Sequence, residues 1–183
     1  MEYAIVELDK DKWKDYEAYF SDYADNCFCI NISNDCDSFH VRMRKVPLQE
    51  RKIIKYPQRL FGSDNPTVRA WGIIDDNQLV AGIETSIENG KNPRLYVSLL
   101  WVDEKYRRQG IAAALVNKAK ERAREEKLRA VYLQTWSCNE HAIAFYLSQG
   151  FKLIGFDSSP FSNEDIEKFN VPLKLGYYFK QEN

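Results

Sequence analysis

The sequence contains no apolar run that could cross a membrane as a helix, which takes about 18 residues. Its first residues also lack the basic segment and apolar block that mark a secretory signal. These two absences argue against a membrane-spanning helix and against an exported precursor. We therefore expect a cytoplasmic protein with no membrane partner.

Neither sign of charge is in clear excess. The chain has 26 Lys and Arg against 27 Asp and Glu, and its formal net charge is −1. No overall basic field attracts nucleic acid, so we expect no nucleic-acid partner, and any anion binding must be local.

Histidine is scarce, and the cysteines are poorly spaced for a metal. There are two histidines and four cysteines, namely Cys27, Cys29, Cys36 and Cys138. A zinc site normally uses two C-x2-4-C pairs or paired histidines. We therefore predict no metal and interpret the cysteines as free thiols of a reducing compartment.

What the chain does have is the composition of one globular domain over residues 1–183. It is 44% hydrophobic, 29% charged and 14% aromatic, and this length suffices for a core. In the first third, we expect a strand at 3–8 and short strands at 27–32 and 39–44. Aromatic residues at spacings of three and four predict an amphipathic helix over 10–24. Residues 48–66 are interpreted as part helix and part loop.

From residue 68 the pattern is sharper. Strands at 68–74, 79–87 and 95–102, joined by turns at 75–77 and 88–93, predict an antiparallel meander. A helix should run from Ile111 to about Lys127, with a buried repeat and an exposed face. The repeat is Ile111, Leu115, Ala119 and Ala123, and the outward residues are Lys118, Glu121, Arg122 and Glu125.

The remaining elements complete a mixed sheet. We expect strands at 130–135, 151–156 and 173–179, and a helix at 139–148. Strands 95–102 and 130–135 flank the long helix, so they should be parallel. The predicted fold class is α+β, an α/β/α sandwich with a mostly antiparallel sheet and a central parallel pair.

The segment between strand 95–102 and the long helix predicts an anion site. Its sequence is Arg107-Arg108-Gln109-Gly110-Ile111-Ala112. A glycine turn that opens a helix directs several backbone N–H groups at one spot, at the positive end of the helix dipole. Two arginines at its edge and the small residues 112–114 suit a bulky polyphosphate. Alone, the pattern also fits a helix that merely begins after a glycine.

A second motif, Asn139-Glu140-His141-Ala142-Ile143-Ala144-Phe145-Tyr146-Leu147-Ser148-Gln149-Gly150-Phe151, follows one strand later. Together the two motifs resemble the GNAT superfamily of N-acetyltransferases, most specifically over residues 95–156. The segments from Gly155 to Asp165 and from Leu175 to Phe179 are loosely similar to the streptothricin acetyltransferase branch.

This resemblance implies acetyl-CoA as co-substrate and a parallel pair that splays apart beside the turn. The coenzyme pyrophosphate would lie on the N–H groups of residues 108–113, and the pantetheine arm along residues 100–102. The arginines would add charge-assisted contacts. The implied coenzyme-binding set is Leu100, Trp101, Val102, Arg107, Arg108, Gln109, Gly110, Ile111, Ala112, Ala113, Asn139 and Tyr146. Residues 68–156 would form the coenzyme-binding core, and residues 10–50 and 156–180 the acceptor side.

The resemblance also implies a proton donor. Tyr146 matches the position whose phenol lies near the coenzyme sulfur and can protonate the leaving thiolate. The alternative is a tyrosine that only packs in the core. Asn139 matches a position that caps the following helix and touches the coenzyme arm, although capping alone would explain it.

The proton acceptor is harder to identify. A primary amine is mostly protonated at pH 7, and exposing its lone pair costs roughly 4–5 kcal/mol. Many family members carry a carboxylate on the strand before the turn, where this chain has Ser98 and Leu99. Glu84 on the adjacent strand is the candidate catalytic base, if it is not a surface residue. A water chain or desolvation of the amine would also serve.

The function predicted from these residues is N-acetylation of a small-molecule primary amine by direct attack on the thioester. An aminoglycoside-like or streptothricin-like antibiotic and a polyamine are the acceptors considered. Acetylation of a protein lysine or N-terminus is the alternative within the class, and a non-catalytic acetyl-CoA sensor the alternative outside it. A homodimer is left open.

Overall fold

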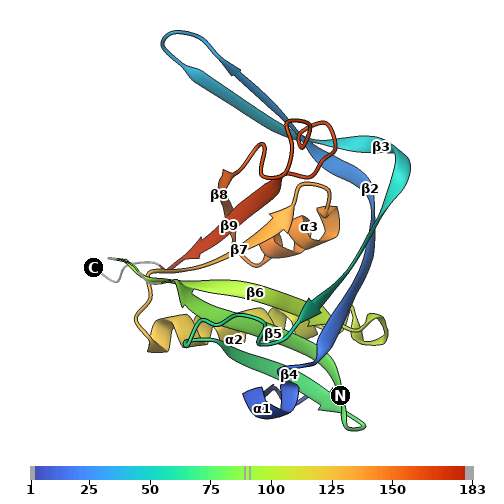
Figure 1. Cartoon of the computed structure of the whole chain (residues 1–183), viewed down its shortest axis with the longest axis vertical. Coiled ribbons are helices and arrows are strands. Elements are labelled where there is room, and N and C mark those ends of the chain that lie inside the picture. The colour runs from blue at the N-terminus through green and yellow to red at the C-terminus, as the bar shows by residue number, and fades with distance from the viewer. Residues whose placement is uncertain (1–2, 89, 91, 180–183) are drawn as a thin grey trace. The chain divides into compact units, whose positions relative to one another are not determined.

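The computed structural model describes residues 3–88, 90 and 92–179, and the chain divides into two compact units. The first unit combines Met1–Phe20, Tyr56–Leu133 and Gly176–Asn183, and the second combines Ser21–Lys55 with Gln134–Leu175. The chain passes from one unit to the other within four strands, β2, β3, β7 and β9 (Figure 1).

The first unit is built on a mixed sheet. Its strands, in spatial order, are β1 (Val6–Glu7), β4 (Arg69–Asp75), β5 (Gln78–Glu88), β6 (Arg94–Val102) and the first part of β7 (Ala130–Trp136). The pairs from β1 to β6 are antiparallel, whereas β6 and β7 are parallel. The turn between β4 and β5 places Asp76 and Asn77 at positive φ, 47° and 61°, as a two-residue hairpin turn needs. The predicted meander and parallel pair are confirmed. The turn predicted at 88–93 lies partly outside the described residues.

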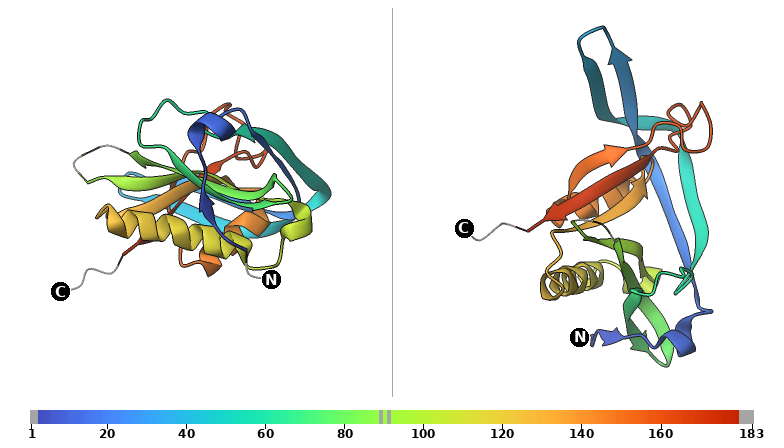
Figure 2. Two further views of the ribbon diagram at one scale, coloured as in Figure 1. Left: turned by 90° about the horizontal axis from the view of Figure 1, so that it is seen from below. Right: turned by 60° about the vertical axis from the view of Figure 1, so that its left-hand side comes forward.

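Helix α2 (Ile111–Glu125) covers one face of this sheet (Figure 2). Its apolar repeat is buried as predicted, at Ile111, Leu115, Ala119 and Ala123. The prediction that Arg122 faces outward is wrong, because its residue is only 2% exposed.

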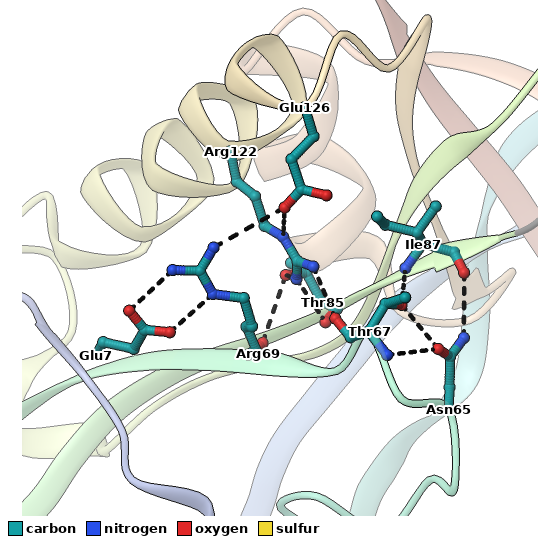
Figure 3. Close-up of polar contacts among 8 residues, drawn as sticks. All are labelled: Glu7, Asn65, Thr67, Arg69, Thr85, Ile87, Arg122 and Glu126. Carbon is teal, nitrogen blue, oxygen red and sulfur yellow. Dashed lines mark hydrogen bonds and ion pairs between the residues drawn. The ribbon is translucent and has the colours of Figure 1, made fainter.

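Arg122 is buried because its guanidinium group joins α2 to the strands beneath it (Figure 3). It donates to the carbonyl and hydroxyl oxygens of Thr85, at 3.0 and 2.7 Å, and to the carbonyl of Thr67 at 2.7 Å. Its Nε donates to Glu126 at 2.7 Å, and Arg69 approaches the same carboxylate at 3.9 Å. A buried guanidinium is stable only with such partners, so this network fixes α2 against β5.

The other face of the first-unit sheet holds an apolar core. Its buried members are Leu8, Ala18, Leu60, Phe61, Ala70, Leu79, Leu99 and Trp101, with Trp13, Tyr16, Phe20 and Val68 packed against them. Short helix α1 (Lys10–Trp13) borders this core. Asp9 caps α1, since its carboxylate accepts from the N–H groups of Asp11 and Lys12.

The helix predicted over 10–24 is wrong beyond Trp13. The chain enters strand β2 (Glu17–Asn34), which pairs with β3 (Phe39–Arg59) in a two-stranded sheet (Figure 1). The strands predicted at 27–32 and 39–44 are confirmed within these longer strands. The helix-and-loop prediction for 48–66 is wrong up to Arg59. Tyr and Phe are good strand formers, and pairing with β3 outweighs their helical spacing.

The second unit contains part of the β2–β3 hairpin, the end of β7, α3 (Glu140–Ser148), β8 (Lys152–Phe156) and most of β9 (Pro172–Tyr178). The strand order in this unit is β7-β9-β8. Its core contains Ile30, Ile143, Val171 and Leu173, with Phe28, Met43, Phe156 and Ile166 packed against them. All the elements predicted from residue 130 onward are present, with ends within one or two residues of those expected.

Candidate active site

The predicted anion-binding turn lies between β6 and α2 in the first unit. A 3-10 turn, η1 (Glu104–Tyr106), follows β6, and Arg108 and Gly110 then adopt positive φ, 62° and 80°. Gly110 is the N-cap of α2, so no side chain caps the helix, and its first turn contains no acidic residue. The N–H groups at this end lie at the positive pole of the helix dipole, which suits an anion.

The turn is held in place by contacts to the neighbouring strands. The Tyr106 hydroxyl donates to Asp75 at 2.7 Å, and the N–H of Asp103 donates to the carbonyl of Val80 at 2.8 Å. The hydrogen bond to the Asp75 carboxylate raises the pKa of Tyr106 to about 12. Arg107 Nε donates to the carbonyl of Val102 at 3.1 Å. These contacts hold the turn against β4, β5 and the end of β6.

The other predicted residues of the turn are accessible. Arg108, Gln109 and Gly110 are exposed, and Ala112 and Ala113 are half-buried. Gln109 also donates to the carbonyl of Lys105 at 3.3 Å. Two partly accessible alanines after the glycine leave room beside the first helical turn.

Strand β6 places the predicted pantetheine-binding residues just before the turn. Leu100 and Val102 are half-buried, whereas Trp101 is buried and its indole N–H donates to the carbonyl of Tyr19 at 3.1 Å. The parallel ladder with β7 joins only Leu95–Val97 to Val131–Leu133, so β6 continues for five residues beyond it.

Glu84 is not a surface residue. It lies on β5, is 3% exposed, and accepts from the Ser98 hydroxyl at 2.7 Å and from the N–H of Phe61 at 2.5 Å. The carbonyl of Ser98 in turn accepts from the side-chain amide of Gln58. Glu84 was predicted as the candidate base, whereas Ser98 was named only as the residue in place of the expected carboxylate. The bond between them and the contact of Gln58 were not predicted. The segment 56–61 is brought to β6 only by the tertiary fold.

Asn139 and Tyr146 belong to the second unit. Asn139 caps α3 as predicted, since its side-chain oxygen accepts from the N–H of Ala142 at 3.2 Å. Tyr146 is 9% exposed, and its ring lies edge-on to Phe151 with centroids 5.7 Å apart. The cap alone accounts for Asn139, and this packing alone accounts for the burial of Tyr146. Their roles toward the coenzyme stay predictions.

Glu140, beside the cap, was missed by the sequence analysis. It is 6% exposed, accepts from the N–H groups of Asp25 and Asn26, and pairs with Lys45 at 2.5 Å. Burial alone would raise its pKa, but the hydrogen bonds from Lys45, Asn26 and Asp25 outweigh it and lower the pKa to about 2. Glu140 therefore ties α3 to β2 and β3 as an anion at neutral pH.

Acidic and aromatic residues within the ranges expected to form the acceptor side, 10–50 and 156–180, differ in their surroundings. Asp165 is 2% exposed and accepts from the N–H groups of Phe161 and Ser162, so it organises its own loop. The carboxylate of Asp22 lies 3.2 Å from Nδ1 of His141. In the first unit, Phe20 stacks on Tyr56 with centroids 4.8 Å apart.

The cysteines are free thiols, of which Cys27 and Cys138 are buried and Cys36 is exposed. Burial raises the pKa of Cys27 to about 11. Among residues 3–88, 90 and 92–179, no three His, Cys, Asp or Glu side chains gather where they could hold a metal ion. Within the same ranges, none of the helices has the length and apolar character needed to span a bilayer.

The mixed sheet, its parallel pair and the uncapped glycine turn before α2 form the arrangement that the family resemblance predicts. Residues 6–151 match the acetyltransferase (GNAT) family, and the chain belongs to this family of acyl-transferring enzymes. Among its relatives is the acetyltransferase Atu2258 of Agrobacterium fabrum, 38% identical over 124 residues, which are 68% of this chain and 84% of that protein. The chain spans less than half the length of the first two curated relatives it matches, 46% and 29%.

Two solved structures match nearly the whole chain. One is a Bacillus anthracis protein assigned as a streptothricin acetyltransferase, in complex with acetyl coenzyme A. It is 21% identical, with a TM-score of 0.68 over 97% of this chain and 100% of that one. The other is nourseothricin acetyltransferase, 24% identical, with a TM-score of 0.73 over 96% and 98%. These likenesses confirm the predicted GNAT fold.

Proposed function

We propose that this protein transfers the acetyl group of acetyl-CoA to a primary amine of a small molecule. The observation that carries the proposal is the uncapped start of α2 behind Gly110, at the end of β6. In a chain of the GNAT family, an anion site in this position supports binding of the coenzyme pyrophosphate.

The residues of the turn fit that group. Backbone N–H groups from Gln109 to Ala113 would receive the phosphate oxygens, and Arg108 would add a charge-assisted contact. Leu100 and Val102 would flank the arm that leads to the thioester. When bound, acetyl-CoA supplies an activated acetyl group, and the protein contributes position and proton transfer.

Two residues are proposed to move protons. Glu84 is the ultimate acceptor of a proton from the amine, because it is a carboxylate held in place by two donors. Tyr146 is the donor to the departing thiolate, a role that the family resemblance supports. Asn139 is proposed to contact the coenzyme arm in addition to capping α3.

A small-molecule acceptor is favoured over a protein acceptor. The two structures that match nearly the whole chain are named for streptothricin and nourseothricin, and an aminoglycoside 6'-N-acetyltransferase also shares the fold at a TM-score of 0.55. We therefore propose an amine-rich antibiotic or a polyamine as the acceptor.

The test is thiol release from acetyl-CoA with a panel of acceptors: a streptothricin, an aminoglycoside, a polyamine and a lysine-containing peptide. We expect turnover with at least one of the small amines and none with the peptide. Tyr146→Phe should lower kcat by about 10² while Tyr178→Phe, an exposed tyrosine, leaves it unchanged. Turnover with the peptide alone would indicate a protein acetyltransferase. Tight coenzyme binding without turnover would indicate a sensor.

A further inference from the structure

Glu84 has an unusual environment for a buried carboxylate. Its described hydrogen-bond donors, the Ser98 hydroxyl and the Phe61 N–H, are both neutral. Within the described part of the chain, no ion pair with Lys, Arg or His compensates its charge. Burying an ionised carboxylate without a cation is costly, so a purely structural role accounts poorly for Glu84.

The strand that carries Ser98 is bulged at that residue. Glu84 pairs with Leu99 and Thr85 pairs with Val97, so Ser98 is the extra residue between them. A β-bulge re-aims the side chain at its position. Here the Ser98 hydroxyl turns toward the side chain of Glu84, and the Ser98 carbonyl turns toward Gln58.

The direction of the Ser98–Glu84 hydrogen bond leaves Ser98 able to bind a cation. An ionised carboxylate can only accept, so the hydroxyl proton must lie toward Glu84. The lone pairs of Ser98 Oγ are then available to another donor, and the charge behind them favours an ammonium group. Ser98 is half-buried, whereas Glu84 is almost fully buried. The amine of a substrate would therefore reach the Ser98 hydroxyl before it reached Glu84.

Ser98 also has a defined place along the strand that leads to the anion turn. It is the first residue of β6 beyond the parallel ladder, which ends at Val97. From Ser98 to Val102 an extended strand spans about 13 Å. A ligand anchored at the turn and extended along β6 would therefore bring its far end toward Ser98.

An aromatic ring lies on the face of β3 that carries Gln58. Tyr56 and Gln58 are two residues apart on β3 and so share a face. Tyr56 stacks on Phe20, and both rings are half-buried. Ring faces attract cations, so they would help to hold a protonated amine beside Ser98.

We infer that Ser98 is the catalytic residue that contacts the acceptor amine, and that Glu84 acts through it. This inference rests on the proposed acetyl transfer. The ammonium gives one proton to Ser98 Oγ as the hydroxyl proton of Ser98 passes to Glu84 Oε1, and Glu84 later releases a proton to solvent. The neutral amine then forms the N–C bond as the C–S bond breaks, and its second proton ends on the coenzyme thiol. Phe61 and Gln58 are positioning residues.

The test compares amines of different basicity at pH 7. An alkylamine of pKa about 10 must lose a proton before it attacks, whereas an alkoxyamine of pKa about 5 is already neutral. Ser98→Ala and Glu84→Gln should each lower kcat/KM about 10²-fold for the alkylamine and less than about fivefold for the alkoxyamine. For the alkylamine, kcat/KM of the double variant should lie within about threefold of the value for the slower single variant.

Controls separate this role from a structural one. Ser98→Thr restores the hydroxyl and should recover kcat/KM to within about tenfold of the wild type. Ser86→Ala removes another buried hydroxyl from β5 and should leave it unchanged. The affinity for acetyl-CoA should be the same in every variant. Equal losses for both amines, or full activity of Ser98→Ala, would overturn the inference alone. A wild type inactive with every amine would overturn the proposed function as well.

Discussion

Two buried glutamates in this protein have opposite kinds of partners. Glu140 is surrounded by backbone N–H groups and the Lys45 ammonium, which together hold it ionised. Glu84 has a hydroxyl and one N–H group, and no described cation compensates its charge. The first arrangement stabilises an anion for structure, whereas the second buries a carboxylate whose described donors are all neutral.

The structural role of Glu140 predicts an acid-sensitive contribution to stability. Its folded pKa of about 2 lies below the ordinary value of 4.5, so the unfolded chain takes up the proton first as the pH falls. The stabilisation is complete above about pH 4.5 and is lost as the pH falls toward 2. Glu140→Gln should lower the free energy of unfolding by about 1–3 kcal/mol at pH 7 and by less at pH 3, as measured with urea.

Glu164 provides the matched control. It pairs with Lys168 at 2.6 Å, but both side chains are more than half exposed. Glu164→Gln should therefore change the free energy of unfolding by less than about 0.5 kcal/mol at either pH. A Glu140→Gln cost that does not depend on pH would contradict the role assigned to the ionised side chain.

Residue roles could be predicted from sequence where they depend on local geometry. The cap at Asn139 and the positive φ of Gly110 follow from neighbours within a few positions. The burial of Arg122 could not be predicted, because its acceptors on Thr67 and Thr85 are distant in the chain. The Ser98–Glu84 bond depends on a bulge that leaves no mark in the sequence.

Helices and strands with a clear hydrophobic period and clear turn residues were assigned correctly from the sequence. The meander, α2 and α3 have clear periods and turn residues, and they lie where predicted. The segment 10–24 has aromatic residues that fit a helix by spacing and a strand by preference. Only pairing with β3, twenty or more residues away, decides between them.

We expect coenzyme binding to depend on the turn that joins β6 to α2. Gly110 has φ of 80°, and an added Cβ would meet open space, so a side chain there strains the backbone without a clash. Asn and Asp tolerate this conformation better than most residues. Gly110→Asn should weaken acetyl-CoA binding about tenfold, whereas Gly110→Asp should weaken it at least about 100-fold, because its charge opposes the phosphates.

Calorimetric titration of the two variants with acetyl-CoA separates charge from size, since Asn and Asp are nearly identical in shape. Near-equal affinities for the two variants would mean that no phosphate lies at this turn. Wild-type affinity in Gly110→Asp would contradict the pyrophosphate site outright.

Over the whole chain, the region expected to bind the acetyl donor was easier to predict from sequence than the region expected to bind the acceptor amine. The two motifs that carry the family resemblance lie within residues 95–156 and depend on local turn and helix-start signals. The acceptor side includes the long β2–β3 hairpin and the loop around Asp165, whose form depends on distant contacts. The residues of this chain therefore predict the acetyl donor, whereas the proposed acceptor depends on chemistry and on the relatives.

Analysis of the product is a direct test of acetyl transfer to nitrogen. The wild-type protein would be incubated with acetyl-CoA labelled in its acetyl group and with the best amine of the panel, and the amine would be examined by mass spectrometry. If the protein transfers acetyl groups to amines, one labelled acetyl group should be found on nitrogen for each thiol released. Thiol release with the label found only in free acetate, or no labelled amine with any acceptor, would contradict it.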